Sequence, residues 1–278
     1  MKTFFKKIIA FVLQVEARLV LLKYKPKIIA ITGSVGKTST KEAVYAVLSN
    51  LAYVRKSEKS YNSEIGLPLT ILGCPNGWQN PLIWLKNLWR GLKLLLWPNN
   101  YPEWLILEVG IGKPGDMRKT AAWLKTDAVI ITAIGETPVH IEFFSSRKHL
   151  VEEKAKLIKT LKKSGLLVLN ADDETVLEMK NKTKSRVITY GFGEKADLRG
   201  SEENIFYDNQ RWPKGIIYRV DEEGNSLPVI LEEMFGKNHI YASLGALALV
   251  SGLKLNLLEA INQLKNYKAP AGRMCLLK

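Results

Sequence analysis

The chain has 278 residues, enough to bury a sizeable hydrophobic core, and we expect one large domain with additions. Lysine and arginine exceed aspartate and glutamate by 14 (41 against 27), and this excess favours an anionic partner such as a nucleotide, a nucleic acid or a lipid. No Lys/Arg block with interleaved aromatic residues resembles an RNA-binding segment, so no nucleic-acid partner is expected. Two distant cysteines, Cys74 and Cys275, form no C-x-x-C motif, which excludes a zinc site of that kind and predicts a reducing cytosol.

Residues 1–26 form a predicted basic amphipathic helix. Its lysines alternate with apolar residues, and at about 100° per residue most of the polar side chains fall on one side. Glu16 and Arg18 interrupt the apolar run, and no cleavage site follows it, so neither a bilayer span nor a signal peptide is predicted. Two interpretations stay open: the helix docks on the domain, or it lies on an anionic membrane surface. We expect a cytoplasmic protein, peripheral at the inner face of the membrane under the second interpretation.

Lys27 to Ser49, KIIAITGSVGKTSTKEAVYAVLS, predicts a strand, a tight loop and a helix. Glycines let the backbone approach a phosphate, the first helical turn offers free N–H groups, a lysine adds charge, and a threonine hydroxyl can ligate Mg²⁺. The loop has the shorter G-x-x-G-K-T form, because Ile31 stands where the full motif has a glycine. The sequence therefore predicts a nucleoside triphosphate site, with the candidates Gly33, Ser34, Val35, Gly36, Lys37, Thr38 and Ser39.

A short strand (52–55) and a helix near Ile65 follow, joined by the polar stretch SYNSEIGLP. Asn62 and Glu64 in this stretch either face the phosphates or form an ordinary helix cap. Both interpretations stay open.

Residues 78–104 are an insertion that contains five tryptophans and many leucines. On a helix from Leu82 to Trp97, the residues on one arc are mostly polar or small: Lys86, Asn87, Arg90, Gly91 and Lys93. Tryptophan and leucine opposite such an arc suit a membrane interface or an apolar partner groove. Burial of that apolar face in the core is the other interpretation.

Two strands then end in polar residues. Residues 104–110, WLILEVG, predict a buried strand that carries Glu108, and residues 127–133 predict the next strand. Ligands bind at the carboxyl ends of strands in an α/β sheet, so Glu108 is a candidate Mg²⁺ ligand. His140 follows the second strand in a loop at the same edge.

The remaining elements complete the fold prediction. Lys148 to Lys163 is expected to be a largely solvent-exposed helix, and strands at 166–170 and 186–191 continue an alternation of strand and helix. This alternation predicts an α/β fold with a doubly wound, mainly parallel sheet. Short alternating runs from Asp197 to Leu231 predict a small antiparallel β extension, and helices at 239–251 and 256–266 follow it.

Several of these motifs together resemble a known family. They are ITGSVGKTSTKE, YNSEIGLPLTIL, LILEVGIGKPGDM, DAVIITAIGETPVHIEFF with EEKAKLI, VLNADD and PAGRM. In this order they are similar to the central ATP-binding domain of the Mur ligases. Among these ligases, the type that joins D-alanyl-D-alanine to UDP-N-acetylmuramoyl-tripeptide is the most similar. The resemblance covers residues 27–274 and implies a P-loop fold.

The resemblance implies an ATP-dependent amide ligase of peptidoglycan precursor synthesis. A carboxylate of a UDP-MurNAc-peptide would attack the γ-phosphate of ATP, and an amino acid or D-Ala-D-Ala would then displace phosphate from the acyl phosphate. Two Mg²⁺ ions are implied, one held by Thr38 and Glu108 and a second by His140. Lys154 matches a family lysine that reacts with CO₂ to form a carbamate, which also contacts metal. Lys37, His140 and Lys154 are thus the catalytic candidates.

Nucleotide-binding positions also follow from the resemblance. Asn62 and Arg273 match family positions near the phosphates and the nucleotide. The family's G-x-H-N-x-x-N motif on the adenine side corresponds to residues 236–242, where the order is Asn238-His239 and the last position is Ala242. Asn238 is the candidate at this place.

The resemblance also implies that the chain lacks the family's N-terminal UDP-binding domain and its C-terminal domain. Two alternatives to the Mur-type ligase stay open. One is a non-catalytic, membrane-associated nucleotide-binding module, and the other is a ligase similar to folylpolyglutamate synthase.

Overall fold

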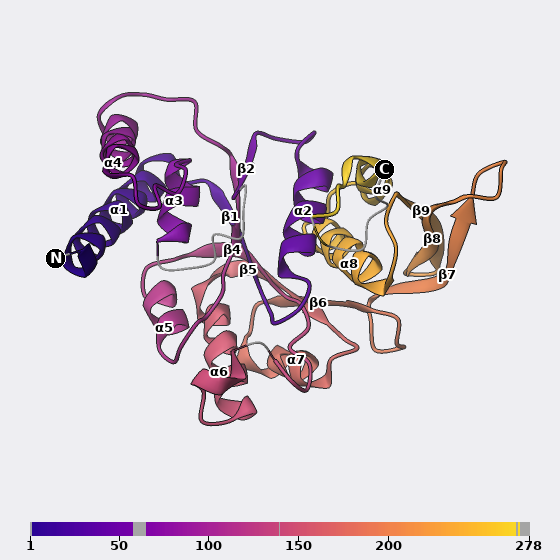
Figure 1. Cartoon of the computed structure of the whole chain (residues 1–278). Helices are drawn as coiled ribbons and strands as arrows, with labels where there is room; N and C mark the ends of the chain where they lie inside the picture. The colour runs from indigo at the N-terminus through magenta and orange to yellow at the C-terminus, as the bar shows by residue number, and fades with distance from the viewer. Residues whose placement is uncertain (1, 58–64, 139, 271, 273–278) are drawn as a thin grey trace.

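The computed structural model describes the chain except for residues 1, 58–64, 139, 271 and 273–278 (Figure 1). Within the described residues, nine strands form one sheet in the order β2-β3-β1-β4-β5-β6-β7-β8-β9. Neighbouring strands pair in parallel from β2 to β7, whereas β8 pairs antiparallel with both β7 and β9. The predicted α/β fold with a doubly wound, mainly parallel sheet is therefore confirmed. The strands are β1 (Lys27–Thr32), β2 (Val54–Lys56), β3 (Trp104–Glu108), β4 (Thr126–Ile131), β5 (Leu161–Asn170), β6 (Arg186–Gly191), β7 (Leu198–Tyr207), β8 (Pro213–Glu222) and β9 (Asn225–Glu232).

The central strand β1 is apolar on both faces because helices cover both sides of the sheet. Ile29 and Ile31 point into one core, while Ile28 and Ala30 point into the other. β1 lies between β3 and β4, and the chain leaves it toward β3 before it crosses back to β4. The carboxyl end of β1 is thus a point where the winding direction changes, which is where open α/β sheets place a ligand crevice.

The helices form two layers, one on each face of the sheet (Figure 1). The first layer contains α2 (Lys37–Leu48), α8 (Lys237–Gly252) and α9 (Leu257–Gln263). The second contains α1 (Lys2–Tyr24), α3 (Gly66–Leu72), α4 (Pro81–Leu96), α5 (Asp116–Ala121), α6 (Arg147–Ala155) and α7 (Glu174–Leu177). Short 3₁₀ turns occur at Ile141–Phe143, Lys156–Thr160, Glu178–Lys182 and Leu264–Asn266.

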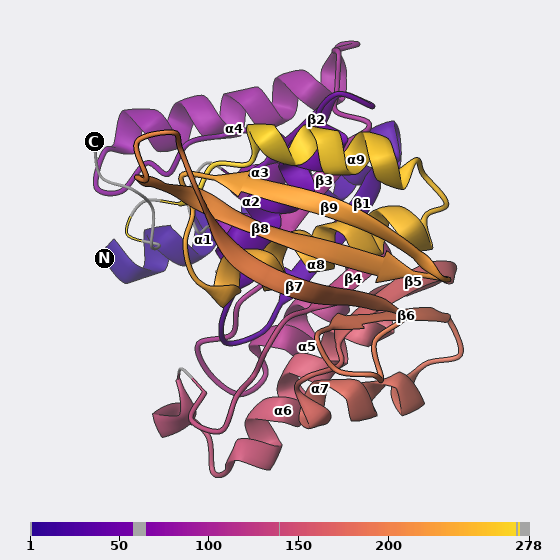
Figure 2. The same ribbon diagram turned by 90° about the vertical axis from the view of Figure 1, so that its right-hand side faces the viewer.

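The predicted antiparallel extension is present and continues the main sheet. β7 pairs in parallel with β6 at Tyr190 and Gly191, and its remaining length pairs with β8 (Figure 2). Val229 and Leu231 of β9 are buried in the same core as α8. The extension therefore shares one hydrophobic core with the parallel part of the sheet.

The helices α1 and α4 pack against each other and leave an apolar surface in solvent. α1 contacts the domain through Leu13, Ala17 and Val20. We call the solvent-facing apolar residues of these two helices the outer face: Ile8, Phe11, Val12, Val15, Leu19 and Leu22 of α1, and Leu82, Leu85, Trp89, Leu92 and Leu96 of α4. None of the described helices is long and apolar enough to cross a bilayer.

The buried side of α4 differs from the expected one. Asn87 and Gly91, placed on the polar arc, are buried, whereas the Trp and Leu residues of the outer face are exposed. The Asn87 side-chain amide donates to the Pro75 carbonyl at 2.8 Å, and Gly91 lets the Glu16 carboxylate approach closely. Burial of the apolar face of α4 in the core is therefore wrong, because small and amide side chains make this helix contact.

The predicted helix from Lys148 to Lys163 is also different. The α-helix ends at Ala155, a 3₁₀ turn follows, and β5 begins at Leu161. Glu153 and Lys154 are buried, so the expectation of a largely exposed helix is wrong on this side. Glu153 accepts hydrogen bonds from the start of α5, and Lys154 donates to the loop after β1.

Candidate active site

The loop between β1 and α2 has the backbone shape of a phosphate cradle. Gly33 has φ 146°, and a Cβ there would lie 2.0 Å from the Thr132 hydroxyl, so no larger residue fits. Gly36 is in the left-handed region with φ 86° and caps the N-terminus of α2. The first-turn N–H groups of a helix have no intrahelical acceptors, and together with the helix dipole they attract phosphate.

Two lysines donate to one carbonyl oxygen of this loop. Lys37 Nζ lies 2.8 Å from the Gly33 oxygen, and Lys154 Nζ, from α6, lies 2.9 Å from the same atom. Burial, together with repulsion by the Lys37 charge, lowers the pKa of Lys154 to about 7. Lys154 is 3% exposed, so a large part of its population is a neutral amine near neutral pH.

Lys154 is brought inward by the residue beside it. The Glu153 carboxylate accepts the backbone N–H groups of Gly115 and Met117 at the start of α5, both at 3.0 Å. Lys156 pairs with its other oxygen. Because these contacts fix α6 to α5, the next side chain, Lys154, is held against the nucleotide loop.

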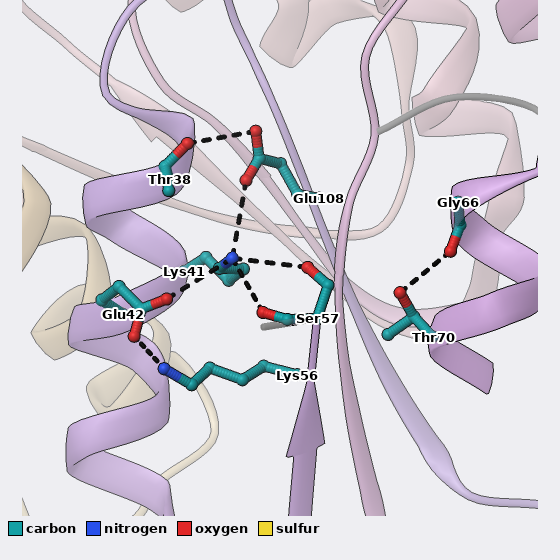
Figure 3. Close-up of polar contacts among 8 residues, drawn as sticks. All are labelled: Thr38, Lys41, Glu42, Lys56, Ser57, Gly66, Thr70 and Glu108. Atoms are coloured by element: carbon teal, nitrogen blue, oxygen red, sulfur yellow. Dashed lines mark hydrogen bonds and ion pairs between the residues drawn. The ribbon is translucent and has the colours of Figure 1, made fainter. Parts of the chain in front are cut away.

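A second polar cluster lies between the first turns of α2 and the ends of β2 and β3 (Figure 3). The Thr38 hydroxyl donates to Glu108 Oε1 at 3.2 Å, and Lys41 Nζ lies 3.9 Å from Glu108 Oε2. Lys41 also donates to the Ser57 carbonyl at 3.0 Å and pairs with Glu42 at 3.4 Å. Lys41 was not among the predicted site residues, although its position three residues after Thr38 places both on one helix face.

This cluster suits a magnesium ion. Glu108 Oε2 is buried and has no hydrogen-bond partner among the described atoms. A carboxylate oxygen and a threonine hydroxyl side by side are oxygen donors of the kind that Mg²⁺ prefers. The described residues hold no group of three or more His, Cys, Asp or Glu side chains that could bind a metal on their own. An ion here would thus need oxygens from a bound phosphate, as is usual for Mg²⁺ at nucleotide sites.

A cavity of about 620 Å³ adjoins the nucleotide loop. Val35 and Gly36 line it from the loop, and Asn238 and Tyr241 line it from the start of α8. His239 points away, into the core, where its Nδ1 lies 2.8 Å from the Tyr267 hydroxyl. In the Asn238-His239 order, the structure therefore places the asparagine in the cavity and uses the histidine in packing.

The structure does not bring the other predicted residues that it describes into these polar contacts. His140 is exposed with φ 70°, and its one described aromatic contact is Phe143, at a ring distance of 6.2 Å. No described contact joins it to Glu108 or Lys154. Ser39 is buried and bonds to Tyr267, whereas Ser34 is buried and its hydroxyl has no hydrogen-bond partner among the described atoms. Asn62 and Arg273 lie outside the described residues.

Comparison with known proteins identifies the family of this domain. Residues 31–83 and 89–250 match the Mur ligase middle domain. UDP-N-acetylmuramoyl-tripeptide–D-alanyl-D-alanine ligase of Bacillus subtilis is 27% identical over 271 residues, which are 96% of this chain and 50% of that protein. The ligase of the same name from Mycobacterium tuberculosis is 32% identical over 161 residues, 58% of this chain and 26% of that protein.

Solved structures show the same fold. MurF ligase from Thermotoga maritima in complex with ADP aligns with a TM-score of 0.76 and 22% identity, over 97% of this chain and 55% of that one. MurF from Acinetobacter baumannii aligns with a TM-score of 0.75 and 20% identity, over 96% and 51%. The chain spans about half the length of these proteins or less. By the extent of the middle-domain match, the chain belongs to the Mur ligase family.

Proposed function

We propose that the protein is an ATP-dependent amide ligase of the Mur type. The observation that carries this proposal is the buried Lys154 amine, held against the Gly33 carbonyl of the nucleotide loop. A module that only binds nucleotide needs no buried amine with a lowered pKa beside its phosphate loop. The names of the relatives suggest a UDP-MurNAc-peptide and D-Ala-D-Ala as substrates.

The reaction needs charge neutralisation more than acid or base groups. A substrate carboxylate oxygen bonds to the γ-phosphorus of ATP while the bond to the β-γ bridging oxygen breaks, and ADP leaves. The amine of the second substrate then attacks the acyl carbon, loses a proton, and releases phosphate. Lys37 and the N-terminus of α2 stabilise the charge that develops on the phosphoryl oxygens.

Magnesium would bind at the edge formed by α2 and β3. Thr38 and Glu108 would hold one ion, and His140 with modified Lys154 would hold a second. When bound, such ions neutralise phosphate charge and orient the transferring group. Asn238 and Tyr241 would face the base side of ATP from α8.

The lowered pKa of Lys154 favours its modification by CO₂. The lone pair of the amine bonds to the carbon of CO₂, and one proton is released, which leaves a carbamate. A pKa of about 7 makes the neutral, reactive form abundant, whereas an exposed lysine near 10.4 is almost fully protonated. The nearby Lys37 charge favours the anionic product.

Lys154→Ala tests the proposal. Ligase or acyl-phosphate activity should fall by at least about 100-fold, while ATP binding by calorimetry stays within about threefold, because Lys37 remains. Activity of the parent protein should rise with added bicarbonate. Because the chain spans about half the length of its relatives, the assay is run with and without an added Mur C-terminal domain.

Lys148→Ala is the matched control, since Lys148 is an exposed lysine on the same helix. Equal activities of the two variants would contradict the proposed role of Lys154. ATP binding without any turnover in the parent protein would favour the non-catalytic module instead.

We also propose that the outer face attaches the protein to an anionic membrane surface. Eleven apolar side chains on two neighbouring helices are exposed there. Large exposed apolar surfaces mark interaction sites. Lys86, Arg90 and Lys93 are exposed on α4 beside its Trp and Leu residues, which suits the level of anionic headgroups.

Co-sedimentation with vesicles of phosphatidylglycerol tests this attachment. The parent protein should sediment at low salt and dissociate at high salt, and Leu85→Ser with Trp89→Ser should remove most of the binding. Trp212→Ser is the control, because Trp212 is equally exposed but lies in the β7–β8 connection. A parent protein that stays in the supernatant at low salt would assign the outer face to a protein partner.

A further inference from the structure

A second cavity, of about 380 Å³, lies between β2, the end of α3 and α4. It is separate from the cavity beside the nucleotide loop, since the two share no lining residue. The proposed ligase reaction uses none of its side chains. Its walls include Tyr53, Arg55, Lys56, Gly73, Cys74 and Arg90.

The cavity is lined by three cations and by no aspartate or glutamate of the described chain. Lys56 is paired with Glu42, so its charge is largely compensated. Neither Arg55 nor Arg90 forms an ion pair within the described residues. Uncompensated guanidinium groups in a concave site create a positive potential that attracts anions.

Arg55 is held in a fixed orientation. Its Nη1 donates to the Ile71 carbonyl at 2.7 Å, and its Cζ lies 4.9 Å from the centre of the Tyr101 ring. Gly73, with φ 68°, passes so close that a Cβ there would be 2.9 Å from the Arg55 Cζ. Three neighbours thus restrict a half-buried arginine, although no described carboxylate neutralises it. Arginines with restricted motion lose less freedom when they bind a phosphate through two N–H groups.

One acid lies nearby but does not line the cavity. Glu16 approaches Gly91 from α1, and burial raises its pKa to about 7. The Cys74 thiol interacts electrostatically with both arginines and with Glu16. Burial raises the pKa of this thiol to about 11. At neutral pH the thiol is uncharged and the carboxyl is only partly charged, so the cavity keeps its positive sign.

We infer that this cavity binds a phosphate mono- or diester through Arg55 and Arg90. A volume of about 380 Å³ admits a phosphate with a small alcohol such as glycerol. Arg90 lies on α4 one residue after Trp89 of the outer face. A phospholipid headgroup and a soluble phosphate ester are two sources of this same chemistry.

The test uses the full chain and two ligands: glycerol 3-phosphate in solution, and vesicles of phosphatidylglycerol or phosphatidylcholine. The variant is Arg55→Lys with Arg90→Lys, which keeps both charges and removes the planar two-donor geometry. Lys86→Arg with Lys93→Arg is the control on α4, outside the cavity. ADP binding and thermal unfolding are measured in the same samples, so a variant that has lost its fold is recognised.

We expect the parent and the control to bind glycerol 3-phosphate in a saturable way, and the variant to bind at least about tenfold more weakly. A parallel loss of phosphatidylglycerol binding in the variant supports the site and assigns a lipid headgroup. An unchanged vesicle interaction, together with the loss of glycerol 3-phosphate binding, supports the site and assigns a soluble ester.

Equal binding of glycerol 3-phosphate by parent and variant would overturn the inference, because charge alone would then explain any attraction. A parent that does not saturate with this ligand would overturn it as well. Neither result bears on the proposed ligase, which is tested at Lys154 and the nucleotide loop.

Discussion

Two regions of the molecule reverse the usual distribution of side chains between core and solvent. At the nucleotide loop, charged residues are buried: Lys41, Glu108, Glu153 and Lys154 are each at most 3% exposed. On the outer face of α1 and α4, large apolar side chains are exposed, and Phe11 and Leu22 are more than 60% exposed. Charged groups are rarely buried without partners, and large apolar patches are rarely left in water.

The two regions differ in how their unusual side chains are accommodated. The buried charges are compensated within the protein, by ion pairs, by backbone groups or by a lowered pKa. The exposed apolar residues are not covered by any other part of the described structure. The first region is thus a prepared site, whereas the second is a surface whose function depends on what covers it.

The largest effect is expected where the prepared site meets its ligand. Lys37→Ala should remove measurable ATP binding, a loss of at least about 1,000-fold. The other lysine that contacts the loop, Lys154, has a pKa lowered to about 7 and carries less positive charge near neutral pH. Calorimetry with Mg²⁺ and ATP measures this. The control is Lys113→Ala, which changes a loop lysine outside both described cavities. Unchanged ATP affinity in Lys37→Ala would rule out the loop as the nucleotide site.

Lys41→Met tests how much the ion pairs of buried Lys41 contribute to the stability of the fold. The change leaves Glu108 and Glu42 without this cation, and the free energy of unfolding should fall by about 3 kcal/mol. Urea denaturation measures it, and Lys41→Arg should recover part of the loss. A fall below about 0.5 kcal/mol, typical of a surface site, would show that the cluster is not energetically coupled.

Glu16→Gln tests whether this buried carboxyl between α1 and α4 makes the stability of the protein depend on pH. The pKa of Glu16 is raised from 4.5 to about 7, so the folded state binds its proton more tightly than the unfolded state. Its stabilising effect is full below about pH 4.5 and is lost as the pH rises through about 7. The parent should lose about 1–3 kcal/mol of stability between pH 5 and pH 8, and Glu16→Gln should lose less.

Denaturation curves at both pH values give this comparison. Glu152→Gln, an exposed acid on α6, is the control and should keep the slope of the parent. Identical slopes in Glu16→Gln and the parent would show that Glu16 stays ionised in the fold.

Much of the fold was predictable from local patterns. The alternation of apolar runs and helical segments predicted the parallel sheet, because a strand buried on both faces reads as a continuous apolar run such as Ile28 to Ile31. The glycines and the lysine of the nucleotide loop predicted its shape, since that shape depends on local backbone conformations. Residues 31–83 and 89–250, where the family match lies, contain most of the correctly predicted elements.

The rest depends on contacts between distant segments. The burial of Lys154 follows from Glu153 and α5, and the orientation of α4 follows from Glu16 beneath Gly91. A charge pattern along one helix does not tell which arc another helix will cover. Lys41 was missed for the same reason, because its partners Ser57 and Glu108 come from two other strands or their ends.

The join between α1 and the sheet has a consequence for how the molecule is oriented. α1 ends at Tyr24 and β1 begins at Lys27, so only Lys25 and Pro26 separate them. Lys23 and Tyr24 also donate to the last carbonyls of α4, which fixes both helices to the start of the central strand. Nothing here resembles a flexible tether. A surface that holds the outer face would therefore also set the direction in which the nucleotide cavity opens.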